Sequence, residues 1–374
     1  MKNIKFGDSI IIGKGSLDYL LNVENKKVFI VTGGKSMFNN GTISKIDNIL
    51  KENNCEVYIH SGIKANPDTL DVEKGLDIMN KFEPDVIIGV GGGSPLDAAK
   101  VMSLIYEYPD INMNNILKVK LPQKREKVIL IAIPSTSGSG TEVSKAAVIT
   151  FKEHNLKYGI KCDAFIPDVA ILDPEITMSM PSKVAAETGM DALTHAVESY
   201  INKNADDFTE ALSLGAIEGI FKNLTISFNE NSLEARGKMH NYQCMAAMSF
   251  ANSGLGMAHG ISHAIGGKFG LGHGLTNAIA LPYVLKFNSR DPIVEEKLKK
   301  LGKIIDSNSF IESVIELNKI LEIPATFKEA GITKEDFNED FDALVENSML
   351  GSTMVNPVKI TKDEMAVLLK NIYG

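Results

Sequence analysis

The chain has 374 residues, of which 44% are hydrophobic and 23% are charged. This length exceeds the size at which a single hydrophobic core usually stops growing, so we expect two domains, and the composition excludes a disordered or fibrous protein. The formal net charge of -8 argues against nucleic acid as a partner, because phosphate binding requires clustered Lys and Arg.

The cysteines and the amino-terminal residues bear on the cellular compartment. Cys55, Cys162 and Cys244 are odd in number and widely spaced, which fits a reducing environment without a disulfide framework. No apolar stretch of a secretory signal follows the first residues, and no apolar run approaches the roughly 18 residues of a membrane span. We therefore expect a cytoplasmic protein that does not bind a membrane.

Strand-like runs are confined to the first half of the chain. β-Branched runs at 28–32, 86–90 and 128–133 alternate with helical stretches and are bounded by Gly or Pro, so each predicts a buried strand. Parallel β/α units are the usual assembly of such an alternation. This half is therefore predicted to be an α/β domain.

The second half is predicted to be all-helical. After about Pro181 the β-branched runs fade, and helical patterns follow at 182–202, 208–223, 232–250 and from His259 onward. Prolines punctuate the chain just before this change. We place the boundary there and expect domains of residues 1–178 and 179–374. Near the carboxyl end, residues 334–346 mix Phe and Leu with carboxylates at helical spacing and predict an amphipathic surface helix.

A glycine-rich turn joins the second predicted strand to a helix. Glycines at 91–93 let the backbone approach a ligand closely, and the free N–H groups of the helix start attract phosphate. Gly92, Gly93 and Ser94 are therefore candidate contacts of a dinucleotide pyrophosphate. The alternative is an ordinary helix capped by Ser94, with Pro95 in its first turn.

Two further segments follow predicted strands. Six hydroxyl residues lie between 135 and 144, which makes Thr136, Ser137, Thr141 and Ser144 candidate cofactor contacts, although a solvated loop is the alternative. Gly33 stands after the first strand, where enzymes that choose NAD commonly place an acidic residue to bind the ribose 2′-hydroxyl. With glycine there, NADP(H) is expected to be favoured over NAD(H).

A group of histidines and one aspartate predicts a metal site. Asp191 and His195 are four residues apart and share one face of a helix. His259, His263 and His273 lie within 15 residues of a glycine-rich segment, in a chain with only seven histidines. One carboxylate with three imidazoles suits Fe(II), Zn(II) or a similar ion. An isolated Asp–His pair would instead be a surface pair or a helix cap.

These segments together resemble the iron-containing, or group III, alcohol dehydrogenase family. The resemblance covers nearly the whole chain, through 13–16, 91–100, 134–144, 189–200, 258–267 and 272–274. Within the family it is most similar to the clostridial-type butanol and general alcohol dehydrogenases. It implies a dehydroquinate synthase-like fold, with an amino-terminal dinucleotide-binding domain, a carboxyl-terminal helical metal-binding domain and the active site in the cleft between them.

The resemblance also implies roles for particular residues. By matching position, the ligands of one divalent ion, Fe(II) or else Zn(II), are Asp191, His195, His259 and His273. His263 matches a histidine near the ion that is usually not a ligand; it is a candidate proton carrier, or else packs beneath the site. The implied cofactor contacts are Asn66, Gly93, Ser94, Asp97, Thr136, Thr141 and Lys157. Metal-free relatives such as the maleylacetate reductases lack this full ligand set.

The expected activity is hydride transfer between NAD(P) and a small uncharged alcohol or aldehyde, in a homodimer or higher homo-oligomer. A lyase of the dehydroquinate synthase type and a non-catalytic filament or binding module on the same fold are the alternatives. The substrate pocket is less well specified by the sequence. Four apolar residues either line it or belong to the core, namely Met248, Phe250, Leu255 and Phe269.

Overall fold

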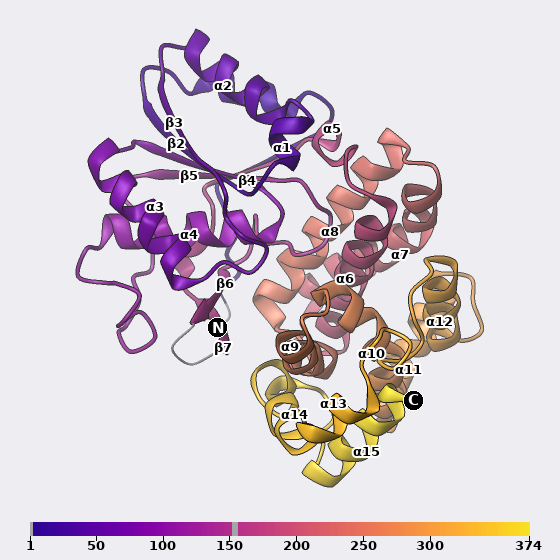
Figure 1. The fold of residues 1–374 in the computed structure, drawn as a ribbon. Helices are drawn as coiled ribbons and strands as arrows, with labels where there is room; N and C mark the ends of the chain where they lie inside the picture. The colour runs from indigo at the N-terminus through magenta and orange to yellow at the C-terminus, as the bar shows by residue number, and fades with distance from the viewer. Residues whose placement is uncertain (1–2, 152–155) are drawn as a thin grey trace. The chain divides into compact units, whose positions relative to one another are not determined.

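A computed structural model describes residues 3–151 and 156–374 (Figure 1). The chain forms two compact units, Met1–Met180 and Pro181–Gly374. The sequence places the boundary at 178/179. The first unit is a parallel α/β sheet and the second is helical, so the predicted fold class is confirmed.

Six parallel strands form the sheet of the first unit, in the order β1-β8-β5-β4-β2-β3. Their bounds are β1 Ser9–Ile12, β2 Lys27–Thr32, β3 Glu56–His60, β4 Val86–Gly91, β5 Ile129–Pro134 and β8 Val169–Leu172. The three strands predicted from the sequence are β2, β4 and β5. They are adjacent in the sheet and almost fully buried, which explains their continuous apolar runs.

Alternate residues of each strand face opposite layers of helices. Phe29 and Val31 of β2 pack with α3 (Thr69–Phe82) and α4 (Gly93–Glu107), whereas Val28 and Ile30 pack with α2 (Thr42–Glu52) and the 3-10 helix η1 (Ser16–Asn22). This alternation follows from the two-residue period of a strand. Figure 1 shows α2 and α3/α4 on opposite sides of the sheet.

The direction of chain crossing reverses between β2 and β4. The chain passes from β2 outward to β3 on one side, but from β4 to β5 on the other. In open α/β sheets, ligands bind beyond the carboxyl ends of strands at such a switch point. Gly33 follows β2 and the glycine turn follows β4, so both lie at this point of the sheet.

The structure also contains an antiparallel hairpin that the sequence did not predict, formed by β6 (Ala146–Phe151) and β7 (Leu156–Lys161). It begins directly after the hydroxyl-rich loop at 135–144. The remaining short elements of the first unit are α1 Ser36–Asn39, η3 Asp163–Phe165 and α5 Pro174–Thr177.

The second unit is a bundle of helices around one core. Its main helices are α6 Ser182–Ile201, α7 Asp207–Asn229, α8 Leu233–Ser253, α9 Met257–Phe269, α10 His273–Asn288, α11 Pro292–Ile304, α12 Phe310–Ile320 and α15 Lys362–Tyr373. Helix α6 packs against α7, α8 and α10, and every residue from Gly189 to Ile201 is buried. Among the described residues, no helix is long and apolar enough to cross a membrane.

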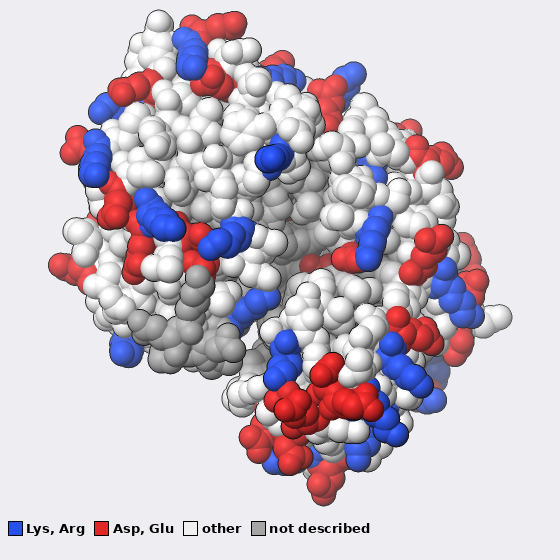
Figure 2. Space-filling view, in the orientation of Figure 1, with Lys and Arg blue, Asp and Glu red and all other residues white. Residues whose placement is uncertain are grey.

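The single helix predicted at 334–346 is wrong in one respect, because two short helices occupy this stretch. Helix α13 (Lys334–Glu339) and helix α14 (Phe341–Ser348) are separated by Asp340, which caps both. Because the chain breaks here, Phe337 of α13 and Leu344 of α14 both pack into the same hydrophobic core. Asp340, between the two helices, forms an ion pair with Lys268. Figure 2 shows acidic side chains gathered over α13 and α14, and charges of both signs elsewhere on the face in view.

Candidate metal centre and nucleotide site

Three polar side chains of α6 project from one face into the helical bundle. Asp191, His195 and Glu198 are spaced by four and three residues, so they are stacked along this face. All three are buried, with 5%, 4% and 1% of their surface exposed. Buried polar groups require partners, and α9 and α10 provide them.

The predicted ligand atoms converge on one carboxylate oxygen. Asp191 Oδ1 lies 3.9 Å from His195 Nε2, 3.7 Å from His259 Nε2 and 3.8 Å from His273 Nε2. Asp191, His195 and His259 form the one buried group in the described chain whose ligand atoms all lie within 4.8 Å of one another. A tetrahedral ion with bonds of about 2.1 Å separates its ligands by about 3.4 Å, so the set fits an ion after a small contraction.

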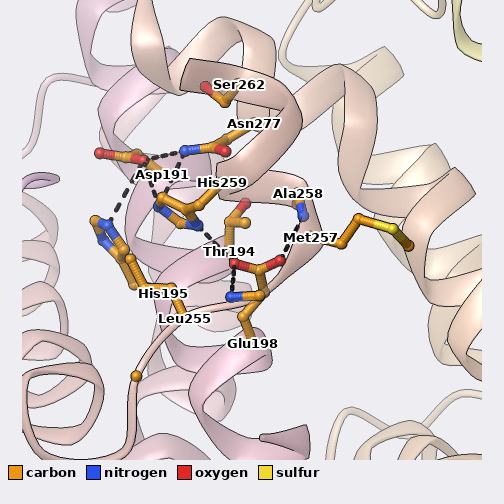
Figure 3. Close-up of polar contacts among 12 residues, drawn as sticks. Asp191, Thr194, His195, Glu198, Leu255, Met257, Ala258, His259, Ser262 and Asn277 are labelled. Atoms are coloured by element: carbon orange, nitrogen blue, oxygen red, sulfur yellow. Dashed lines mark hydrogen bonds and ion pairs between the residues drawn. The ribbon is translucent and has the colours of Figure 1, made fainter. Parts of the chain in front are cut away.

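Glu198 holds His259 from behind (Figure 3). Its carboxylate accepts N–H bonds from Gly256 at 2.8 Å and Ala258 at 2.6 Å, and lies 2.6 Å from His259 Nδ1. Because Nδ1–H of His259 donates a hydrogen bond to Glu198, Nε2 is unprotonated and its lone pair faces Asp191. Burial, and next the neighbouring imidazoles, hold the pKa of His259 well below its usual range, so the ring is neutral. Burial also raises the pKa of Glu198 to about 7, although these N–H donors oppose the rise.

His273 and His263 complete the cluster on its more accessible side. His273 begins α10, its Nδ1 lies 3.0 Å from Ser262 Oγ, and 42% of its side chain is exposed. The exposed His263 stacks on His273, with ring centroids 5.1 Å apart, and meets His259 edge-on at 6.3 Å. The residue predicted to carry protons thus adjoins the cluster and contacts solvent.

The apolar residues considered for a substrate pocket are not equivalent. The ring of Phe250 stacks on His195 with centroids 4.4 Å apart, so it borders the metal cluster directly. Phe269 instead packs against the core of the bundle. Leu255 and Met248 are half-buried, and their backbone carbonyls accept side-chain amide bonds from Asn202 and Asn252.

In the first unit, the turn between β4 and α4 has glycine where a side chain would not fit. Gly91 has a φ of 137°, which side-chain-bearing residues rarely adopt. A Cβ on Gly93 would lie 3.0 Å from Ser139 Oγ, so the turn and the hydroxyl-rich loop touch there. The cap of α4 is Gly92 and has no side-chain bond, so the alternative of Ser94 as the cap is wrong; Ser94 Oγ donates to the carbonyl of Ala65 instead.

Three of the predicted cofactor residues belong to a buried network around Lys100. The Lys100 ammonium donates to Thr141 Oγ1 at 3.0 Å and to the Ser144 carbonyl at 2.8 Å, while Asp97 accepts from Thr141 and from the Val148 N–H. Lys100 is 1% exposed, and burial lowers its pKa to about 8. These bonds tie the loop and the hairpin to α4, beneath the glycine turn.

The other predicted contacts are more open. Gly33 is half-buried, and its own neighbourhood leaves room for a side chain, since a Cβ there would meet only the Ile63 carbonyl at 3.6 Å. Asn66 and Lys157 are 91 positions apart yet joined by a bond of 2.9 Å from Lys157 Nζ to Asn66 Oδ1. Thr136 is half-buried beside Gly92, and Ser137 is buried.

Sequence reasoning missed Glu198, Asn277 and Lys100. Glu198 could have been found, because it falls on the same helical face as Asp191 and His195. Asn277 lies one turn after His273 in α10, but an asparagine there is equally typical of a helix surface. Lys100 carries no sequence signal, because a lysine within a helix is usually solvated.

Known proteins resemble both units. A family model described as iron-containing alcohol dehydrogenase matches residues 8–174, and one for the carboxyl-terminal part of the Fe-containing alcohol dehydrogenase family matches 185–373. An NADPH-dependent butanol dehydrogenase of Clostridium saccharobutylicum is 42% identical, over 97% of this chain and 96% of that protein.

Solved structures resemble it over the full length as well. An iron-containing alcohol dehydrogenase from Thermococcus thioreducens has a TM-score of 0.92 and 33% identity, covering 100% of this chain and 99% of that one. A sulfoacetaldehyde reductase from Bifidobacterium kashiwanohense, solved in complex with NAD+, has a TM-score of 0.90 and 25% identity, covering 100% and 98%. The chain therefore belongs to the iron-containing alcohol dehydrogenase family and is an oxidoreductase.

Proposed function

We propose that this alcohol dehydrogenase interconverts small uncharged alcohols and aldehydes with NADP(H), using one Fe(II) or Zn(II) ion held by Asp191, His195, His259 and His273. The observation that carries the proposal is the convergence of three imidazole Nε2 atoms on Asp191 Oδ1, at 3.7 to 3.9 Å. The similarity to a butanol dehydrogenase supports an uncharged substrate. The test is a substrate panel, followed at the nicotinamide absorbance with each cofactor and each metal.

The side chains divide the work between them. A bound ion would polarise the substrate oxygen and favour hydride transfer with the nicotinamide cofactor. Asp191 supplies the single negative charge of the ligand set, and Glu198 fixes the orientation and tautomer of the His259 ring. His263 is exposed next to His273, a position suited to relaying a proton between the substrate oxygen and water. Phe250 provides an apolar wall beside His195 that would exclude water.

The cofactor would bind at the switch point of the sheet in the first unit, the proposed dinucleotide-binding domain of residues 1–178. Gly92, Gly93 and Ser94 would carry the pyrophosphate, with Thr136, Ser137, Asn66 and Lys157 around it. We infer that Asp97, Thr141 and Ser144 contribute by holding the loop through Lys100. The three described cysteines are free and buried, in keeping with a cytoplasmic enzyme, which we expect to be a homodimer or higher homo-oligomer.

Substituting Gly33 by Asp is expected to impair NADPH far more than NADH. A carboxylate there would repel a 2′-phosphate, a contact that costs on the order of 1–3 kcal/mol once partly desolvated. The side chain should fit, because the nearest atom to a Cβ is 3.6 Å away. The measurement is kcat/KM with each cofactor, and Gly34→Asp, whose Cβ would meet nothing within 4 Å, is the neighbouring control. A wild type that prefers NADH, or an unchanged ratio in Gly33→Asp, would contradict NADP(H) preference.

Replacing Glu198 by Gln is expected to weaken metal binding by roughly 10–100-fold, the usual effect of losing a partner behind a ligating histidine. A glutamine has one acceptor oxygen, so in either orientation its NH2 faces the N–H of Gly256 or Ala258. Metal affinity is measured by chelator competition, with Glu210→Gln as the control because that carboxylate pairs with Lys297 instead. Equal affinity in Glu198→Gln and wild type would exclude the assigned role.

Two other classes of protein were compatible with the sequence, a lyase and a non-catalytic module. A lyase of the dehydroquinate synthase type would use NAD transiently, so it would show no net consumption of NADPH with an aldehyde. A filament or binding module would need no metal ligands. Membership of an oxidoreductase family and the clustered ligand atoms favour the dehydrogenase.

A further inference from the structure

Asn277 occupies the centre of the metal cluster without being one of the predicted ligands. Its amide nitrogen Nδ2 lies 2.8 Å from Asp191 Oδ1, 3.1 Å from His259 Nε2 and 3.2 Å from His273 Nε2. The side chain is fully buried, and Figure 3 shows its amide directed at Asp191 and His259. One N–H2 group thus faces three of the four atoms expected to bind the ion.

The orientation of this amide follows from its neighbours. If the oxygen pointed inward, it would face the Asp191 carboxylate at 2.8 Å and the lone pairs of two imidazoles, all of which are acceptors. With Nδ2 inward, its two N–H groups face the three acceptors, so one N–H is shared between two of them. The amide oxygen Oδ1 then points away, buried and without a hydrogen-bond partner among the described residues. Such an orphan costs free energy, so the inward contacts must offset it.

In His259 and His273, the contacts of both ring nitrogens indicate the same tautomer, with the proton on Nδ1. Glu198 accepts a hydrogen bond from Nδ1–H of His259, and Asn277 donates to Nε2 of the same ring. For His273, Ser262 contacts Nδ1 while Asn277 again faces Nε2. In this arrangement Nε2 is unprotonated in both rings, and a bound ion would replace the Asn277 N–H at each of these lone pairs.

We propose that Asn277 is a positioning residue of the metal centre: its amide donates to Asp191 Oδ1 and holds that carboxylate toward His259 and His273, and so sets metal affinity. A bound ion would take over the Nε2 lone pairs of the two histidines, so the bond to Asp191 is the one that would remain. The inference rests on the proposed metal site. A positioning role can be distinguished from a purely structural one, because it predicts that two substitutions of Asn277 change Zn(II) affinity in opposite directions.

The test is titration of the purified full chain with Zn(II) against a chromogenic chelator. Asn277→Ala is expected to weaken Zn(II) binding by about 10–100-fold, since the Asp191 carboxylate loses the donor that holds it. Asn277→Asp keeps the shape but turns a donor into an acceptor carboxylate beside Asp191. A cation relieves that repulsion, so this variant is expected to bind Zn(II) at least as tightly as wild type and to gain more thermal stability from it.

Asn318→Ala is the matched control. Asn318 is also a buried asparagine of the helical unit, but its amide donates to the Ala278 carbonyl. It should lower the melting temperature and leave Zn(II) affinity unchanged. The inference is overturned if Asn277→Ala binds Zn(II) within twofold of wild type, or if Asn277→Asp weakens binding more than tenfold. If Asn277→Ala does not fold, the Asp variant alone decides. A wild type that binds no Zn(II) would overturn both this inference and the metal site itself.

Discussion

Replacing His259 or Asp191 by alanine is expected to remove the bound ion and to lower turnover by about 1,000-fold or more, because the ion supplies several kcal/mol of charge stabilisation. Both residues are buried and meet at 3.7 Å, so nearby water would not replace the lost ligand easily. Metal content is measured by elemental analysis and turnover at the nicotinamide absorbance. Both should fall together.

Cofactor binding should survive in these variants. Asp191 and His259 belong to the helical unit, whereas the glycine turn belongs to the α/β unit. His240→Ala is the control, because it removes another fully buried imidazole of the helical unit from α8. It should cost stability but retain the ion. Full metal content and a near-normal rate in Asp191→Ala or His259→Ala would show that the ligand set is wrong.

Replacing Gly93 by Val is expected to raise the dissociation constant of the cofactor by well over tenfold. The branched side chain would occupy the space through which a pyrophosphate approaches the start of α4. It would also press on Ser139, whose Oγ lies 3.0 Å from the position of a Cβ on Gly93, and so displace the hydroxyl-rich loop. The dissociation constant is measured by fluorescence or calorimetric titration of NADPH.

Folding must be separated from binding in this experiment. Circular dichroism and melting temperature are recorded for Gly93→Val and for Gly159→Val, a strand position of β7 whose Cβ would meet nothing within 4 Å. Gly159→Val should bind NADPH normally. A folded Gly93→Val with wild-type affinity would move the phosphate site away from this turn.

The strands predicted from the sequence are those with continuous apolar runs. The runs that became β2, β4 and β5 are buried on both faces, so every residue had to be apolar or small. Asp191 and His195 could be paired because four residues span one helical turn. The edge strand β1 has only four residues, three of them isoleucine, and so forms a shorter run than β2, β4 or β5. Strand β6 alternates more buried and less buried residues, and it was not predicted.

Contacts made across the chain could not be predicted in this way. The carboxylate of Glu198 reaches His259 over 61 positions, and Asn277 reaches Asp191 over 86. Neither pairing leaves a trace in local spacing. The same holds for Lys100, whose burial depends on the loop that folds over α4.

The dependence of turnover on the ion tests the central claim most directly. The protein is stripped with a chelator, assayed for NADPH oxidation with butanal, and then reconstituted with Fe(II) under anaerobic conditions. The metal-dependent dehydrogenase proposed here should lose activity on stripping and regain it in proportion to added Fe(II), with saturation at one ion per chain. NADPH oxidation that persists at full rate in the stripped protein would contradict a metal centre at Asp191, His195, His259 and His273.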